Sequence, residues 1–310
     1  MSKLQFGPLF FPTEEGPEAL ELARLADDLG YDYFWVPDYV TLPYLDAFVL
    51  LAAAARETRN VRLGTAVTLA PFRSPFQMYK DAASVDVLSD GRLTLGIGIG
   101  AVPRDFEIAQ VDFRKRGRIS DEYIDITRRL LAGENVDYNG EYYSFRDLTM
   151  GPRPVQEPVP IWIGANGKNG FPQGVLRRAG RLGDGFFPTE TPVAMFREAQ
   201  AAIKEHAEAA GRDPESIGWG LLTWGALAGS REEGVRTAER EIGARLNKVH
   251  TVNPLGGYAV GRPEDMIETI ESFAEIGVTN FVLDPGCHPR DIRTLVETFA
   301  REVIPHFRNR

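Results

Sequence analysis

Residues 61–101 read VRLGTAVTLAPFRSPFQMYKDAASVDVLSDGRLTLGIGIGA and contain a strand, a helix and a second strand in succession. Apolar and β-branched residues at 61–67 and 92–99 predict the two strands. Between them Pro75 opens a helix over 75–88. Strands of this kind, apolar on both faces and linked by a helix, belong to parallel sheets that are covered by helices.

The same alternation continues in both directions along the chain. Strands are predicted at 3–11, 33–36, 61–67, 92–99, 159–164, 185–188, 217–222 and 279–284. Helices are predicted at 18–29, 45–56, 75–88, 118–131, 173–181, 192–210, 231–249, 264–276 and 290–307. Eight strand–helix units predict an α/β fold, a closed (β/α)8 TIM barrel, with residues 1–310 in a single domain.

Two insertions account for the length beyond a minimal barrel. Such barrels take about 250 residues, which leaves on the order of 60 of the 310 in this chain. We place the extra residues at 101–117, after the fourth strand, and at 133–158, before the fifth strand. The second insertion contains Asn139-Gly140, which predicts a hairpin turn.

Composition excludes several classes of function. The chain has 35 Lys and Arg against 44 Asp and Glu, a net charge of −9, so its surface disfavours nucleic acid and anionic membranes. One cysteine and four histidines without ligand spacing predict neither a metal site nor a disulfide, and Cys287 beside His288 is interpreted as a buried, inert thiol. No signal or membrane-spanning segment is evident, so a cytoplasmic location is expected.

TIM barrels keep their active sites at the C-terminal ends of the strands. Polar and glycine residues that follow the predicted strands are therefore candidates for a functional site. Asp38-Tyr39 follows the strand at 33–36, where Asp38 could transfer protons or merely cap the next segment. The run Gly98-Ile99-Gly100-Ala101 would let a flat ring or a phosphate approach the backbone. The longer run Gly96–Ala101 matches G-x-G-x-x-A and so also allows a Rossmann dehydrogenase, but no helix starts directly after it.

A second glycine-rich stretch, GANGKNG at 164–170, precedes the helix at 173–181. Its amides and Lys168 would together bind a phosphate in an otherwise acidic protein. The alternative is a glycine-rich loop with a solvated lysine.

Four blocks of sequence carry a family resemblance: LADDLGYDYFWVPDY, the stretch quoted above, GPRPVQEPVPIWIGANG and AGRLGDGFFP. In this order and spacing they resemble the bacterial luciferase-like superfamily, most closely its oxidoreductases that use the deazaflavin coenzyme F-420. The resemblance implies hydride transfer between the coenzyme and a small organic substrate. Two alternatives stay open, an FMN-dependent luciferase-like monooxygenase and a non-catalytic flavin-binding relative.

The resemblance also implies roles for individual residues. Ala66-Val67 would be a non-prolyl cis peptide that forms a bulge and supports the central ring of the coenzyme. Asp38 and Tyr39 would lie at the ring edge, although relatives commonly have histidine in place of Tyr39. Contacts to the ribityl phosphate region would come from Gly98, Gly100, Ala101, Gly164, Ala165, Asn166 and Gly167. The family also suggests a homodimer, and the apolar run at 47–55 is wide enough to contribute to one.

Overall fold

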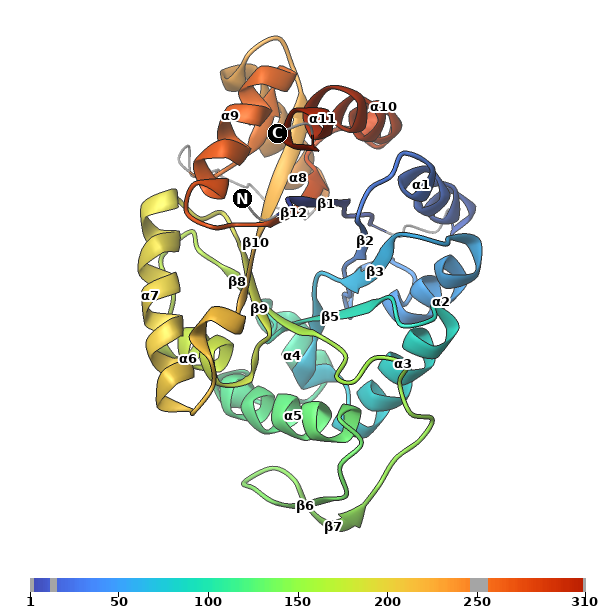
Figure 1. Ribbon diagram of the computed structural model, residues 1–310, viewed down its shortest axis with the longest axis vertical. Coiled ribbons are helices and arrows are strands. Elements are labelled where there is room, and N and C mark those ends of the chain that lie inside the picture. The colour runs from blue at the N-terminus through green and yellow to red at the C-terminus, as the bar shows by residue number, and fades with distance from the viewer. Residues whose placement is uncertain (1–2, 12–15, 246–255, 309–310) are drawn as a thin grey trace.

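A computed structural model describes residues 3–11, 16–245 and 256–308. Its centre is a parallel sheet in the order β1 (Gln5–Pro8), β12 (Asn280–Pro285), β10 (Gly218–Leu227), β9 (Gly185–Thr189), β8 (Ile161–Asn166), β5 (Leu93–Gly98), β3 (Arg62–Thr65) and β2 (Tyr33–Val36). A parallel bridge between Leu9 and Trp35 joins β1 to β2, so the sheet curls round to its own start. The predicted TIM barrel is confirmed (Figure 1).

Helices surround the sheet: α1 (Gly16–Asp28), α2 (Ala47–Glu57), α3 (Pro75–Leu88), α5 (Arg116–Leu131), α6 (Gln173–Leu182), α7 (Val193–Ala209), α9 (Pro263–Ala274), and α10 (Ile292–Thr298), which continues through a π-helical turn at Phe299–Val303 into α11 (Ile304–Arg308). Local signals fix their starts. Asp46 caps α2 by accepting from the amides of Phe48 and Val49, and Ser74 caps α3 ahead of Pro75. None of the helices in the described ranges is long and apolar enough to cross a membrane.

Large aromatic side chains fill the barrel interior, and glycines on the strands make room for them. The Trp35 indole packs on Gly64 so closely that a side chain there would collide with it. Trp162 lies in the same way against Gly185 and Gly218. With Phe187, which is tilted against Trp35 and edge to face with Trp162, these rings make the interior a packed core and not a pore.

Both predicted insertions lie where the sequence places them. The first contains the short helix α4 (Pro103–Ile108), and the second is a hairpin of β6 (Val136–Asn139) and β7 (Ser144–Leu148) that projects from the barrel in Figure 1. Its loop spans 140–143, longer than the predicted two-residue turn. Glu122 of α5 holds this loop because its carboxylate accepts from the amides of Glu141, Tyr142 and Tyr143.

A third insertion, which the sequence analysis does not count, lies between β10 and α9. It contains α8 (Arg231–Arg245) and β11 (Ala259–Gly261), which extends the sheet beside the C-terminal half of β10. Ala238 of α8 packs against Gly286, just beyond β12, and Arg245 reaches Asp284. This helix therefore covers the C-terminal ends of β10 and β12. Residues 246–249 of the predicted helix lie outside the described residues.

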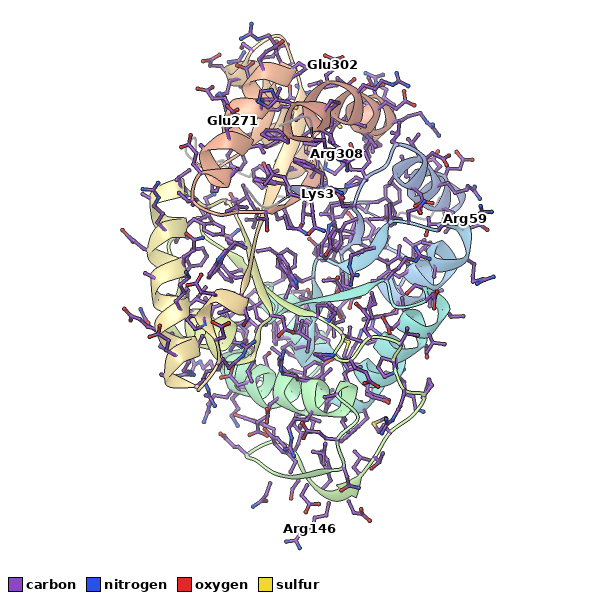
Figure 2. The ribbon with its side chains drawn as sticks, viewed as in Figure 1. Lys3, Arg59, Arg146, Glu271, Glu302 and Arg308 are labelled. Carbon is purple, nitrogen blue, oxygen red and sulfur yellow. The ribbon has the colours of Figure 1, made fainter. Side chains whose placement is uncertain are left out.

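The opposite end of the barrel is tied together by charge. Asp32, just before β2, accepts from the Phe6 amide and forms ion pairs with Lys3 and Arg308 at 3.4 and 3.1 Å. Lys3, near the N-terminus, and Arg308, near the C-terminus, are both labelled in Figure 2. These contacts join the first strand to the last helix, far from the predicted site.

Candidate functional site

Most of the predicted site residues come together at the C-terminal ends of neighbouring strands. β5 pairs with β8 on one side, and on the other with β3 and the two-residue strand β4 (Thr68–Leu69). The peptide bond between Ala66 and Val67, which lies between β3 and β4, is cis, so this prediction is confirmed. The Asp38 amide donates to the Val67 carbonyl at 3.2 Å, which brings the end of β2 into the same group.

The half-buried Val67 side chain lies across two of the predicted glycines. A Cβ atom at Gly98 would lie 2.5 Å from Val67 Cγ2, and one at Gly164 would lie 2.5 Å from Val67 Cγ1. Real Cβ atoms do not approach so closely, so any side chain at either position would force Val67 to move. Sequence analysis explained these glycines by a ligand, whereas the structure explains them by the packing of Val67.

The backbone amides predicted to bind phosphate fall into two groups. The Gly167 amide already donates to the Thr189 carbonyl at 2.8 Å, and the Lys168 amide donates to Asn166 Oδ1 at 2.9 Å. By contrast, the amides of Gly100 and Ala101 make no hydrogen bond within the described part of the chain. The end of β5 is therefore better prepared than the loop after β8 to donate to a phosphate.

Sequence reasoning missed a buried glutamate beside that loop. Glu190, immediately after β9, is only 2% exposed and has a positive φ of 53°. Its carboxylate accepts from the Asn166 side-chain amide at 2.6 Å. Asn166 therefore connects β8 to the end of β9, and its role in this structure is to hold the loop.

Asp38 belongs to a cluster of charges centred on Arg73, a second residue that sequence reasoning missed. Arg73 donates through Nε and Nη2 to the two oxygens of Asp38 at 3.2 and 3.3 Å, and Thr68 Oγ1 donates to Asp38 Oδ2 at 2.9 Å. The same guanidinium contacts Asp46 at 2.5 Å and Asp81 at 3.3 Å. One cation thus joins three carboxylates, one just after β2, one at the N-cap of α2 and one in the middle of α3.

The pKa values of Asp46 and Asp81 are shifted in opposite directions from their ordinary value. Burial would raise the pKa of Asp46, but the hydrogen bonds from Arg73 and from the α2 amides outweigh it and hold the pKa below its ordinary value. Burial raises the pKa of Asp81 despite hydrogen bonds from Gln77 and attraction to Arg73. The cluster therefore depends on its single guanidinium to keep three negative charges together.

Replacing Arg73 by glutamine should destabilise the protein most at neutral pH. Without the guanidinium the three carboxylates repel one another, and we expect a loss of about 1–3 kcal/mol in the free energy of unfolding, below the 3–5 typical of a fully buried pair because the site is partly exposed. Repulsion disappears as the carboxyls protonate, so the difference from wild type should shrink below about pH 4. Urea unfolding at both pH values measures it, and an equal difference at both would contradict this account.

Tyr39 lies on the other side of the mouth, in an aromatic cluster with Phe11 and Tyr44. Its ring centroid is 6.2 Å from that of Phe11 and 5.6 Å from that of Tyr44. Burial raises the pKa of Tyr39 to about 12, partly opposed by Arg245. Tyr39 is consequently a neutral hydrogen-bond donor at physiological pH and no base.

We expect Tyr39→Phe to lower turnover less than about tenfold, the value of one ordinary hydrogen bond. Its pH–rate profile should match that of wild type from pH 6 to about 10, because the Tyr39 phenol stays protonated throughout this range. Tyr39→His, which introduces an imidazole at the same position, should add an ionisation near pH 6–7. Steady-state rates across pH test both variants. An ionisation below pH 10 present in wild type and lost in Tyr39→Phe would overturn this role.

The thiol and histidine after β12 are not arranged for catalysis. Burial raises the pKa of Cys287 to about 12, so the thiol stays protonated, as the sequence analysis expected. His288 Nδ1 accepts from the Arg290 amide at 3.3 Å and caps a short turn. Among residues 3–11, 16–245 and 256–308, no three His, Cys, Asp or Glu side chains gather as a metal site would need.

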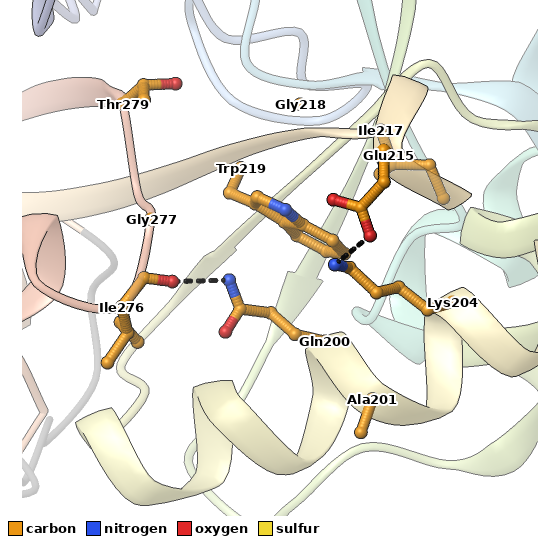
Figure 3. Close-up of a pocket in the computed structure, with 10 residues that line it drawn as sticks. All are labelled: Gln200, Ala201, Lys204, Glu215, Ile217, Gly218, Trp219, Ile276, Gly277 and Thr279. Carbon is orange, nitrogen blue, oxygen red and sulfur yellow. Dashed lines mark hydrogen bonds and ion pairs between the residues drawn. The ribbon is translucent and has the colours of Figure 1, made fainter. Parts of the chain in front are cut away.

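A pocket of about 550 Å³ lies at the other end of the barrel, away from all these residues (Figure 3). It is lined from α7, from the start of β10 and from the turn before β12. Its charged groups already pair, since Lys204 contacts Glu215 at 2.6 Å, and Gln200 donates to the Ile276 carbonyl. The N-terminal ends of barrel strands rarely carry catalytic groups, so the candidate site remains at the mouth.

Comparison with known proteins agrees with this geometry. A sequence model of the family described as luciferase-like monooxygenase matches residues 11–258. The chain belongs to the luciferase-like monooxygenase family. Among relatives of this luciferase-like chain, the F-420-dependent glucose-6-phosphate dehydrogenase of Beutenbergia cavernae is 31% identical over 94% of both chains. The oxygenase component of the flavin-dependent trigonelline monooxygenase of Acinetobacter baylyi is 34% identical over 49% of this chain and 44% of its own.

The fold of this luciferase-like chain also matches solved structures. Coenzyme F-420 dependent tetrahydromethanopterin reductase from Methanopyrus kandleri superposes with a TM-score of 0.82. The alignment covers 99% of this chain and 100% of the other, at 21% identity. The family and the fold that the four sequence blocks predict are therefore both confirmed.

Proposed function

We propose that the protein is an oxidoreductase that uses coenzyme F-420 to transfer hydride to or from a small organic substrate. The observation that carries the proposal is the mouth of the barrel around the cis peptide Ala66-Val67. There Val67 is half-buried and flanked by Gly98 and Gly164, so three neighbouring strand ends offer a surface with one short apolar side chain. Relatives named as F-420-dependent glucose-6-phosphate dehydrogenases, at 26–31% identity over nearly their full length, support it.

The residues present fit a flat tricyclic ring that carries a phosphate-bearing tail. An isopropyl group between two glycines would support the ring, and the amides of Gly100 and Ala101 are available as donors to the phosphate. When bound, F-420 supplies the hydride chemistry at its C5 atom. The chain would supply position: Val67 beneath the ring, Asp38 held by Arg73 at its edge, and the neutral Tyr39 phenol as a donor facing the substrate side.

An FMN-dependent monooxygenase is the second candidate, favoured by the trigonelline monooxygenase relative. FMN also has a flat tricyclic ring, so the surface around Val67 would suit either coenzyme in our proposal. A titration of the purified protein with F-420 and with FMN decides between them. We expect tighter binding of F-420. Preferred binding of reduced FMN with oxygen consumption would replace this proposal, and binding of either coenzyme without turnover of any substrate tried would favour a non-catalytic relative.

We also propose a homodimer that uses α2. Most of its apolar run faces the barrel, including Phe48, Leu50 and Leu51, but Val49 is 70% exposed. A dimer would cover this side chain. Sedimentation at micromolar concentration tests the proposal, and a monomer would reject it.

A further inference from the structure

We infer that the mouth of this barrel accepts an uncharged substrate and rejects phosphorylated ones, and that Asp284 is the residue that sets this preference by neutralising Arg245. The inference rests on the proposed function, since it names the class of substrate for that site. It also separates this chain from its relatives named as glucose-6-phosphate dehydrogenases, since the substrate in that name carries a phosphate.

Arg245 is the cation that α8 brings to the C-terminal end of β12. Its Nη1 lies 2.9 Å from Asp284 Oδ1, and its Nη2 donates to Asp284 Oδ2 at 3.0 Å. Nη1 also donates to the Pro285 carbonyl at 3.1 Å. Arginine holds carboxylate and phosphate ligands through its N–H groups, and here Nη2 alone donates to Asp284, whose Oδ1 lies close to Nη1 without accepting a hydrogen bond. Here the chain's own carboxylate takes the place of an anionic ligand.

The Arg245–Asp284 pair is largely buried, which makes it hard for an anionic ligand to displace Asp284. The Asp284 side chain is 6% exposed and that of Arg245 is 18% exposed. The guanidinium carbon lies 3.7 Å from the centroid of the Phe11 ring, so an aromatic face covers one side of the cation. An incoming phosphate would have to displace a buried carboxylate and leave it without a partner, which is strongly unfavourable.

The other arginine at the mouth is engaged as well. Arg73 already contacts Asp38, Asp46 and Asp81. This cluster holds three carboxylates to one guanidinium, so a phosphate brought against Arg73 would meet net repulsion.

The surface next to Arg245 suits a neutral molecule. Phe11, Tyr39 and Tyr44 pack edge to face or tilted, with centroids 5.6 to 6.2 Å apart. Such a cluster offers apolar ring faces together with phenol hydroxyls. An uncharged substrate with an alkyl or aromatic body and one hydroxyl or carbonyl oxygen matches this chemistry.

Calorimetric titration with glucose 6-phosphate tests the inference in three proteins, each without coenzyme and again with F-420 present. Wild type should show no saturable binding at millimolar concentration. Asp284→Asn removes the negative charge while keeping the shape, so it should bind glucose 6-phosphate at least about tenfold more tightly, the effect of one gained charge-assisted contact. The control is Asp121→Asn, which frees Arg178 between α5 and α6, and it should behave like wild type.

Saturable binding of glucose 6-phosphate to wild type would overturn the inference by itself, whether or not Asp284→Asn folds. Equal affinities in wild type and a folded Asp284→Asn would overturn the role of Asp284. Thermal unfolding establishes that each variant is folded. The fluorescence of F-420 measures coenzyme binding separately. If the protein does not bind F-420, the proposed function fails, but the glucose 6-phosphate titration without coenzyme still tests the inference.

Discussion

Replacing Asp38 by asparagine should lower turnover by roughly 10²–10⁴-fold, the usual cost of a lost acid–base group, with little change in coenzyme affinity. Asparagine keeps the shape and one acceptor oxygen, so Thr68 and Arg73 can still donate to it. It removes the charge and the capacity to carry a proton. Stopped-flow measurement of coenzyme reduction gives the rate, and titration gives the affinity.

Asp46→Asn is the matched control for this experiment. Asp46 contacts the same guanidinium at 2.5 Å but belongs to the α2 cap and is 40% exposed. If Asp38 acts in proton transfer, Asp46→Asn should leave the rate within a few-fold of wild type. Equal losses in the two variants would show that both act by positioning Arg73, and would remove the catalytic role from Asp38.

Gly98→Ala should weaken coenzyme binding by roughly tenfold to a hundredfold. The added methyl group would lie 2.5 Å from Val67 Cγ2, so the Val67 side chain must move from the surface that we propose for the ring. Overpacking of this kind costs about 1–3 kcal/mol. Fluorescence titration with F-420 measures the affinity, and urea unfolding measures the stability.

A second substitution makes this prediction specific. In the double variant Gly98→Ala/Val67→Ala the nearest remaining contact of the new methyl group is the Cβ atom of residue 67, at 3.5 Å, which is an ordinary van der Waals distance. Binding should therefore recover to that of Val67→Ala alone. If the double variant binds no better than Gly98→Ala, the effect does not pass through Val67 and the coenzyme lies elsewhere.

The sequence predicts the barrel well because its signals are local. Each strand is a short apolar run, and each helix has its own start, such as Ser74-Pro75 before α3. The cis peptide at Ala66-Val67 was accessible only through the family resemblance, since no local pattern distinguishes it. α8 was recognised as a helix, but its place over the mouth depends on contacts with Gly286 and Asp284 that periodicity does not reveal.

The arginines that pair with the site carboxylates are the residues that the sequence does not reveal. Asp38 can be found because it follows a strand, whereas Arg73 is 35 residues away and has no such position in the strand–helix pattern. Asp284 did carry a signal, a lone carboxylate at the end of the apolar run NFVLD, which could have marked it as a residue of the mouth. Its partner Arg245 could not be found in this way, because α8 is an insertion with no fixed place in the barrel pattern.

The filled interior of the barrel determines by which end a ligand can reach Val67. Trp35, Trp162 and Phe187 block the axis, so nothing can pass from the pocket at the N-terminal end to Val67. Every molecule that reaches Val67 must enter and leave by the same opening. Two ligands that share one opening must bind in a fixed order, because the deeper ligand has to bind first and can dissociate only after the outer one has left. The outer ligand can be exchanged while the deeper one stays bound.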